Sequence, residues 1–284
     1  MIDLEDITYV RLGTRDLAEA ERYATEILGL QVGRREAGAV YFRSDNREHT
    51  LCYFEGDPTD HTVAFEVATQ SALDKACAAL EEAGHIVTLG SADDMERRRV
   101  KGLASLYDPN GNKVELVVRP EVSGWRYFPS RDAGITGFSH VGLCSSNPAR
   151  DEVFWTNIFN ARVSDYIGNS PLLRIDEVHH KIALFPTQRK GIQHINHQVA
   201  SIDDIMRSWY FLQERQIRIQ FGPGRHPTSG AMFLYFEGPD GMVYEYSTGV
   251  SHITDEENHR PRQFPAVPEG FCMWGAKPDI AEFK

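Results

Sequence analysis

The sequence repeats itself, and this repetition constrains the fold more than any other feature. Residues 7–32 and 135–163 follow one pattern: a β-rich run, a polar turn, a stretch with apolar positions at helical spacing, and a second strand-like run. Apolar residues of the same kind recur in the two stretches: Tyr23, Ile27 and Leu28, then Phe154, Ile158 and Phe159. The chain is therefore expected to contain two copies of one structural unit.

Later segments of the two halves also correspond: 43–54 with 174–185, 61–84 with 193–216, and 103–118 with 233–248. In the second pair, a strand runs into a capping Ser or Thr and an amphipathic helix. In the third pair, two strand-like runs flank a Gly turn, and a Glu follows that Gly by four residues, at Glu115 and Glu245. Each half therefore contains two β-α-β-β-β modules, which predicts an α+β fold of two tandem domains.

A break between the halves falls at residues 119–134, which contain Pro and Gly and show no clear periodicity. We predict an N-terminal domain over 1–125 and a C-terminal domain over 126–284. The tail beyond about residue 250 is polar and then Pro-rich. We expect it to pack across the second domain as an irregular arm, because four apolar residues in it are poorly suited to solvent: Phe264, Phe271, Met273 and Trp274.

Composition narrows the class of protein. The 284 residues carry 30 Lys and Arg against 41 Asp and Glu, a net charge of -11, and no dense basic stripe. This balance argues against nucleic acid or an anionic membrane as the main partner. The N-terminus lacks the apolar core of a signal peptide, and no apolar run approaches the length of a membrane span. Four Cys without C-x-x-C spacing predict free thiols and a cytoplasmic protein.

Histidine is unevenly distributed, with three of the 11 His before residue 130 and eight after it. Aligning the halves places His140, His194 and Glu245 at strand positions where the first half has Tyr9, Thr62 and Glu115. Two imidazoles and a carboxylate thus occur together only in the second half. Two His and one carboxylate form the facial triad that holds Fe(II) and leaves positions open for substrate and O2. Mn(II) and Zn(II) accept the same ligands, so the residues alone do not select the metal.

Each of these residues taken alone has an ordinary explanation. A single His in a strand is usually a hydrogen-bonded core or rim residue, and a Glu after a Gly turn usually faces outward. Glu115 illustrates this point, since it occurs without a His pair. The joint occurrence of the three residues at matching strand positions is what favours a metal site.

Further polar residues accompany the triad. His179 and His180 are expected on the hairpin strand that precedes His194, and His226 lies in the Gly/Pro loop FGPGRHPTSG. Tyr235 is expected to face the same interior as Glu245, ten residues later, because side chains alternate along strands. A His and a Tyr beside a metal suit proton transfer and hydrogen bonding to a bound phenolate. The alternative is that Tyr235 is a core residue and His226 an ordinary loop residue.

These motifs together resemble one known family. The strand G-x-x-H-V-G-L-C, the His-His pair, H-x-x-x-Q before SIDD, G-R-H with a later Tyr, and PDGMVYEYSTG occur in that order. The chain resembles, from residue 5 to about 275, the type I extradiol catechol dioxygenases of the vicinal oxygen chelate superfamily. This group includes 2,3-dihydroxybiphenyl and catechol 2,3-dioxygenases. The resemblance implies that each domain forms an open barrel-like cavity and that only the second domain holds a metal.

The resemblance also implies roles for individual residues. His140, His194 and Glu245 would bind Fe(II), with Mn(II) as the alternative, and His180 would be the catalytic acid/base. The residues implied to contact the substrate or its oxygens are His226, Tyr235, Thr228 and Leu172, with Leu173 a further candidate near the ring. His197 lies three residues from His194, so it should face the other side of the strand and be structural.

The implied reaction is extradiol ring cleavage, in which both atoms of O2 enter a catechol-type diol during the degradation of aromatic compounds. The implied partners are a small catecholic substrate, O2 and further copies of this chain. Many relatives that act on two-ring substrates carry Asn-Asp just after the loop His, where this chain has Thr228-Ser229. That difference leaves one-ring and two-ring diols both open.

Two other functions fit the same scaffold. One is a metal-dependent isomerase or lyase of the glyoxalase kind, which by resemblance would draw ligands from both halves. The other is a non-enzymatic protein that binds an aromatic ligand. By resemblance, such proteins are typically half as long as this chain and lack the metal residues.

Overall fold

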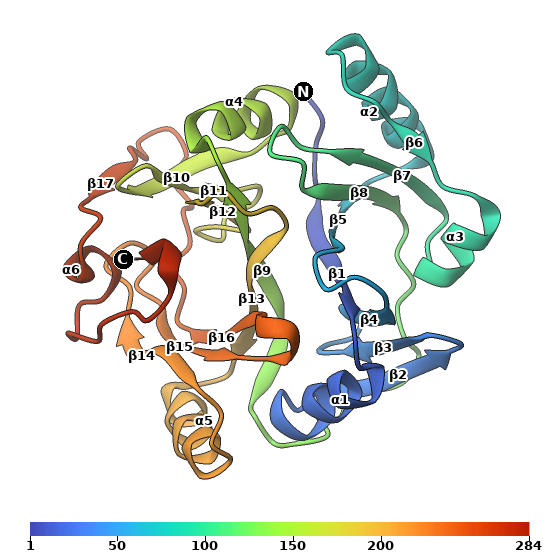
Figure 1. The fold of residues 1–284 in the computed structure, drawn as a ribbon. Helices are drawn as coiled ribbons and strands as arrows, with labels where there is room; N and C mark the ends of the chain where they lie inside the picture. The colour runs from blue at the N-terminus through green and yellow to red at the C-terminus, as the bar shows by residue number, and fades with distance from the viewer. Residues whose placement is uncertain (284) are drawn as a thin grey trace.

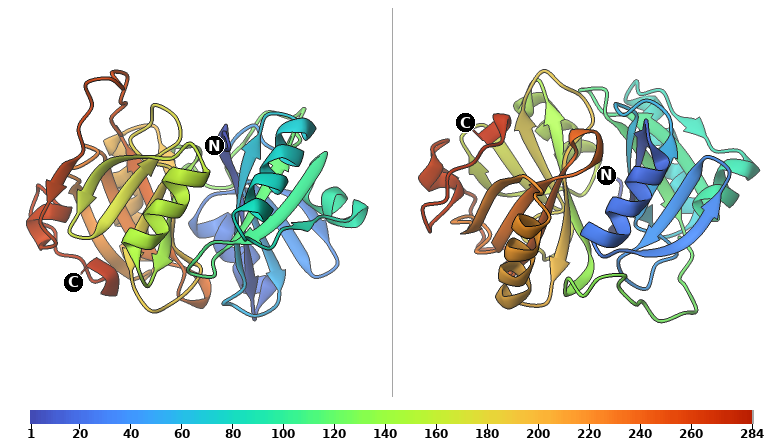
Figure 2. Two further views of the ribbon diagram at one scale, coloured as in Figure 1. Left: turned by 90° about the horizontal axis from the view of Figure 1, so that it is seen from above. Right: turned by 60° about the horizontal axis from the view of Figure 1, so that its bottom comes forward.

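The computed structural model describes residues 1–283, which form two curled sheets (Figure 1). The first half contributes an eight-stranded sheet and the second half a nine-stranded sheet. The segment 119–134 between them contains no named helix or strand, as expected. The predicted α+β fold with two tandem pairs of βαβββ modules is confirmed. The two lobes stand side by side in both views of Figure 2.

The first half contains two modules in sequence. The first is β1 (Asp6–Thr14), α1 (Leu17–Arg22), the π-helical turn η1 (Tyr23–Ile27), β2 (Gln31–Glu36), β3 (Ala39–Arg43) and β4 (Leu51–Glu55). The second is β5 (His61–Val67), α2 (Gln70–Glu82), β6 (Thr88–Leu89), α3 (Ala92–Arg98), β7 (Gly102–Tyr107) and β8 (Lys113–Val118).

The second half repeats this order and adds a C-terminal arm. Its first module is β9 (Ile135–Ser145), α4 (Pro148–Ile158), β10 (Arg162–Ile167), β11 (Ser170–Arg174) and β12 (Ile182–Pro186). Its second module is β13 (Ile192–Val199), α5 (Ile202–Glu214), β14 (Ile219–Arg225), β15 (Met232–Glu237), the 3-10 turn η2 (Pro239–Gly241) and β16 (Val243–Thr248). The arm contains β17 (Arg262–Phe264), α6 (Pro268–Phe271) and the 3-10 turn η3 (Ala281–Phe283).

The helices after β5 and β13 begin as the sequence predicts. Thr69 caps α2 by accepting a hydrogen bond from the Ala72 amide, and Ser201 caps α5 by accepting one from the Asp204 amide. Each hydroxyl satisfies an amide that has no partner within its own helix. The caps fix where each strand turns into its helix, and so fix the direction of the preceding strand.

The registers of the two sheets match residue for residue at their centres. In the order β1-β5-β8, Tyr9 lies opposite Ala64, and Ala64 opposite Glu115. In the order β9-β13-β16, His140 lies opposite Asn196, and Asn196 opposite Glu245. The alignment that paired Tyr9 with His140 and Glu115 with Glu245 is therefore confirmed by strand pairing.

Alternation along the strands gives each sheet two distinct faces. The convex faces pack into one apolar core that spans both halves and includes Ile195 and Tyr244. Tyr244 also meets Tyr53 of the first half, with 2.5 Å between their hydroxyl oxygens. We call the concave faces the N-terminal cup and the C-terminal cup; both are open, and neither sheet closes into a barrel.

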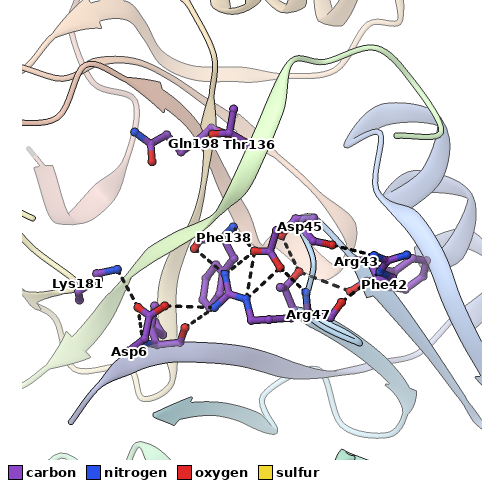
Figure 3. Close-up of polar contacts among 12 residues, drawn as sticks. Asp6, Phe42, Arg43, Asp45, Arg47, Thr136, Phe138, Lys181 and Gln198 are labelled. Atoms are coloured by element: carbon purple, nitrogen blue, oxygen red, sulfur yellow. Dashed lines mark hydrogen bonds and ion pairs between the residues drawn. The ribbon is translucent and has the colours of Figure 1, made fainter. Parts of the chain in front are cut away.

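Charged side chains tie the central strands of the two halves together (Figure 3). Arg47 donates hydrogen bonds to the carbonyls of Ile7 on β1, at 2.5 Å, and Phe138 on β9, at 3.1 Å. Lys181 of the second half reaches Asp6 of the first at 2.8 Å. These contacts join the strands that carry Tyr9 and His140. The division into domains at residues 125 and 126 stays a prediction.

The tail packs as an arm against the second half, as expected. Strand β17 pairs in parallel with β10, and the arm lies across the open side of the C-terminal cup in Figure 1. Phe271 and Phe283 are buried in the cluster on the concave face. The expectation was wrong for Met273 and Trp274, which are 62% and 52% exposed. Two buried aromatic residues are enough to anchor the arm, so these side chains can stay in solvent.

No helix within residues 1–283 has the length and apolar character needed to cross a membrane. All four cysteines are free, as the sequence predicts, and the structure shows that all four are buried.

Candidate metal centre

Three neighbouring strands of the C-terminal cup carry the predicted ligands. His140 lies on β9, His194 on β13 and Glu245 on β16, and these strands are adjacent in the sheet. His194 precedes by two residues the Asn196 that pairs with both His140 and Glu245, so all three side chains share one face. The strand register is therefore what gathers residues that are distant in sequence.

The three ligand atoms lie close together. His140 Nε2 is 3.2 Å from His194 Nε2 and 3.0 Å from Glu245 Oε2, and His194 Nε2 is 3.4 Å from the same oxygen. All three side chains are buried. Within residues 1–283 this is the one group of three or more His, Cys, Asp or Glu side chains arranged to hold a metal ion.

The arrangement fits a divalent metal. Adjacent octahedral ligands that are each about 2.1 Å from an ion stand about 3.0 Å apart, close to the spacing of these three atoms. Glu245 Oε2 is buried and accepts no hydrogen bond from the described chain, which leaves its lone pairs for an ion. The other oxygen lies 3.6 Å from His226 Nε2.

A bulge in β13 helps to orient His194. The register between β13 and β9 shifts between Ile192 and His194, and Gln193 occupies the extra position. Gln193 Oε1 is 2.5 Å from His194 Nδ1, so it accepts the Nδ1 proton and leaves the Nε2 lone pair for a metal. Gln193 was not among the residues singled out from the sequence; its only signal was its place beside a candidate ligand.

The charges of the ligands suit metal binding. Burial works against ionisation of Glu245, but the neighbouring imidazoles of His140, His194 and His226 hold its pKa well below the usual range. Burial lowers the pKa of His140 to about 4, despite the opposing influence of Glu245. At neutral pH the group therefore presents a carboxylate and a neutral imidazole, which are the forms that bind metals.

His226 and Tyr235 stand next to this group. His226 donates from Nδ1 to the carbonyl of Phe271 in the arm, at 2.8 Å, which leaves Nε2 to accept a hydrogen bond from the Tyr235 hydroxyl at 3.2 Å. Tyr235 lies directly opposite Glu245 in the sheet, so the two side chains share a face as predicted. Burial and the nearby Glu245 raise the pKa of Tyr235 well above its usual value. The pair can offer hydrogen bonds to an oxygen at the metal centre.

His180 borders the group from another direction. Its ring lies against that of His140, with 4.3 Å between centroids. The prediction that His179 and His180 lie on a strand was wrong, because both lie in the loop between β11 and β12. The loop frees the two side chains from strand alternation, so consecutive rings can meet instead of pointing to opposite faces.

The other residues singled out from the sequence lie on different faces of the sheet, and only some of them are on the side of the metal centre. Leu172 belongs to the apolar cluster of the C-terminal cup, together with Tyr235, whereas Leu173 points into the shared core and cannot line the site. Thr228 is buried, and its carbonyl accepts a hydrogen bond from Arg262 at 2.6 Å. His197 lies between Phe138 and Tyr244 on the convex side, as its spacing predicted.

Phe283 is a wall residue that the sequence reasoning missed. It lies in η3, with ring centroids 4.7 Å from Phe185 and 5.8 Å from Tyr235. Phe185 in turn lies 5.8 Å from the ring of His194. The final residues of the described chain thus complete an aromatic wall beside the triad.

The N-terminal cup shows what replaces the metal. Arg98, from α3, donates from Nε to both carboxylate oxygens of Glu115 at 2.9 Å, and the Tyr9 hydroxyl donates to Glu115 at 2.7 Å. The ring of His49, the counterpart of His180, stacks on Tyr9 at 4.8 Å. A guanidinium therefore supplies the positive charge that the buried Glu115 needs, and tyrosine occupies the position of a ligand. Sequence comparison could not find Arg98, because α3 has no equivalent in the second half.

The sequence model of one superfamily matches both halves of the chain, over residues 6–116 and 137–246. The chain belongs to the glyoxalase/bleomycin resistance protein/dioxygenase superfamily. Apart from a few terminal residues, the two matches span strands β1 to β8 and β9 to β16, and they leave out the linker and the arm.

Relatives within this superfamily align over most of the chain. A 1,2-dihydroxynaphthalene dioxygenase of Sphingobium xenophagum is 25% identical over 268 residues, which cover 88% of this chain and 90% of the relative. An iron-dependent extradiol dioxygenase of Rhodococcus jostii is 23% identical, covering 96% and 97% of the two chains. The expected resemblance to extradiol dioxygenases is confirmed.

Solved structures of the superfamily share the fold. A halotolerant catechol dioxygenase superposes with a TM-score of 0.89 at 21% identity, covering 100% of this chain and 98% of the other. A Mn(II)-bound glyoxalase from Novosphingobium aromaticivorans gives a TM-score of 0.87 at 23% identity, covering 100% and 94%. At this identity the likeness establishes the architecture, which both kinds of enzyme use.

The triad generates a prediction about metal content. His194→Ala should abolish tight iron binding, and Gln193→Leu should weaken it about 10- to 100-fold, because the partner of a metal-bound imidazole orients that ligand. Iron analysis and titration after anaerobic purification measure both effects. His197→Leu is the matched control, since it removes a buried imidazole from the other face of β13. Loss of iron in the control, or full iron binding by His194→Ala, would contradict the assignment.

The N-terminal cup generates a prediction about stability. Arg98→Met should lower the free energy of unfolding by about 3–5 kcal/mol, because it leaves the Glu115 carboxylate buried without a positive partner. Adding Glu115→Gln should recover part of that loss. Urea unfolding measures both variants, with Arg97→Met on the exposed side of α3 as the control, expected to change stability by no more than about 0.5 kcal/mol.

Proposed function

We propose that this protein is an extradiol ring-cleaving dioxygenase, which inserts both atoms of O2 into a catechol-type diol during the degradation of aromatic compounds. The observation that carries the proposal is the buried His140–His194–Glu245 group, with proton-handling side chains on two sides of it. A bound Fe(II) would supply the redox chemistry that joins the diol to O2, with Mn(II) as the alternative metal.

In this proposal, His226 and Tyr235 hold the oxygens of the bound diol. Tyr235 donates its hydroxyl proton to His226 in the structure, and an incoming oxygen can compete for the same donor. The high pKa of Tyr235 keeps its hydroxyl protonated at neutral pH, so it acts as a hydrogen-bond donor. A fixed donor beside Glu245 orients the diol against the sheet and favours one of its two oxygens.

His180 serves as the acid/base of the proposed reaction. It lies beside His140, and burial lowers its pKa well below the usual value, with contributions from His140 and His179. A neutral imidazole can take the proton that the diol loses on binding and return it to an oxygen later.

The walls of the cup exclude water and hold the ring. Leu172 and Phe185 come from one module, and Phe221 and Phe233 from the other, all within the buried apolar cluster. Thr228 lies in the same loop as His226, between β14 and β15, and we propose that it contributes to substrate selection through the position of that loop.

The glyoxalase alternative would need ligands from both halves. The carboxylate that the first half offers, Glu115, is already bound by Arg98 and Tyr9. This favours a metal centre built from the second half alone, as the dioxygenase proposal requires.

We further propose a cytoplasmic location, which suits four free, buried cysteines, and assembly into a homo-oligomer without nucleic acid or membrane partners. Light scattering on the purified protein tests the oligomeric state.

A substrate panel tests the proposed reaction. Protein purified without oxygen and loaded with Fe(II) should, on addition of O2, consume one O2 per diol and form a yellow ring-fission product. Comparing kcat/KM for catechol, 2,3-dihydroxybiphenyl and 1,2-dihydroxynaphthalene identifies the substrate class. Binding without O2 uptake would instead support a ligand-binding protein, and conversion without O2 would support an isomerase.

The role of His180 has its own prediction. His180→Ala should leave iron content unchanged and lower turnover by about 10²- to 10⁴-fold, the usual contribution of a general acid/base. Steady-state kinetics and iron analysis on the same preparation measure both quantities. His85→Ala, a histidine of the first half, is the control expected to keep full turnover. An unchanged rate in His180→Ala would remove His180 from the mechanism.

A further inference from the structure

A chain of hydrogen bonds leads from His180 away from the metal centre. His180 Nδ1 is 3.1 Å from His179 Nδ1, and His179 Nε2 is 2.9 Å from Asp165 Oδ2. All three side chains are buried. Asp165 lies on β10, at a register shift between β10 and β11, so β10 and the loop between β11 and β12 meet in this line of contacts.

The far end of the chain is held ionised by the C-terminal arm. Arg262 donates to Asp165 Oδ1 from its backbone amide at 2.8 Å and from Nε at 3.1 Å, and its Nη2 reaches Oδ2 at 2.6 Å. Burial opposes ionisation of Asp165, but the hydrogen bonds from His179 and Arg262 hold its pKa below the usual value. Asp165 is therefore a carboxylate, which can only accept hydrogen bonds.

An ionised Asp165 dictates where the protons of the two imidazoles lie. His179 must carry its proton on Nε2 to donate to Asp165, so its Nδ1 holds a lone pair. That lone pair requires a proton on His180 Nδ1. A neutral imidazole carries one ring proton, so His180 Nε2 is left as a proton acceptor.

The repeat supports this reading. In the first half, Glu48 occupies the position equivalent to His179, and its carboxylate lies 2.7 Å from Nδ1 of His49, the counterpart of His180. In both halves, therefore, a hydrogen-bond acceptor faces Nδ1 of the equivalent histidine, His49 or His180. In the first half this acceptor is the carboxylate itself, whereas in the second half the imidazole of His179 lies between His180 and the carboxylate of Asp165.

We propose that Asp165 and His179 are positioning residues that set the tautomer of His180, so that His180 offers Nε2 as the base of the reaction. This inference rests on the proposed function, since it assigns how that acid/base is prepared. A proton that leaves the diol goes to His180 Nε2, and the resulting imidazolium still donates from Nδ1 to His179. The arm contributes to this chain of hydrogen bonds through Arg262, which keeps Asp165 ionised.

Asp165→Asn tests the proposal with almost no change in shape. The amide oxygen at the Oδ1 position can keep two of the three Arg262 contacts. The amide nitrogen then takes the Oδ2 position, loses the contact with Arg262 Nη2, and donates to His179. The hydrogen bonds then reverse, and His180 carries its proton on Nε2. We expect kcat to fall by about 10²- to 10⁴-fold, while KM changes by no more than about threefold and iron content is unchanged.

Asp151→Asn is the matched control. Asp151 is also fully buried and bound to an arginine, Arg150, and to the hydroxyl of Ser145, but it lies outside the hydrogen-bond chain. The control should keep its turnover within about threefold of the wild type. An equal loss of kcat in the two variants would show a general effect of removing a buried charge and would overturn the proposal.

Combining Asp165→Asn with His180→Ala separates positioning from structural damage. If Asp165 acts through His180, the double variant should be no slower than His180→Ala alone. A further loss equal to that seen in the single Asp165→Asn variant would overturn the proposal.

A measurement of tautomers closes the test without relying on activity. Nitrogen-15 NMR of the Zn(II)-loaded wild-type protein should show His179 protonated on Nε2 and His180 on Nδ1, and Asp165→Asn should reverse both. The opposite tautomers in the wild type would overturn the proposal even if the variant fails to fold. If the Fe(II)-loaded wild type cleaves no diol, the proposed function fails, and the tautomer result still stands or falls separately.

Discussion

A carboxylate buried at the centre of each curled sheet needs a positive partner, and the rest of the structure is arranged around that need. In the first half, the partner is the guanidinium of Arg98, delivered by α3. In the second half, two imidazoles and an unshared carboxylate oxygen leave room for a metal ion. An uncompensated buried charge is costly, so each carboxylate needs either a guanidinium or a metal ion beside it. The duplicated scaffold therefore holds a structural ion pair in one copy and a reactive centre in the other.

The strict alternation of strand side chains lets one sheet serve two purposes. Along β13, His194 faces the cup while Ile195 faces the core shared with the first half. The first lobe thus packs against the back of the strands that carry the ligands, and Arg47 fastens β1 to β9 by their carbonyls. A lobe without a metal still helps to hold the metal centre rigid.

Much of the centre was predictable from the sequence, because a repeat carries its own comparison. His140 and His194 differ from their counterparts in the first half, whereas Glu245 matches its counterpart. The strand register then brings the three side chains together. The loop that carries His180 was mistaken for a strand, because its apolar neighbours suggest one. Arg98, Asp165 and Phe283 could not be found, since each reaches its site through contacts between elements that no local pattern records.

The arm makes the centre sensitive to local unfolding at its edge. The carbonyl of Phe271 fixes the imidazole of His226, and Phe283 forms part of the aromatic wall, but none of the three metal ligands lies in the arm. The arm joins the sheet through one short strand, β17, at its edge. Local unfolding of the arm would therefore release His226 and open the aromatic wall before it disturbed the strands that carry the ligands.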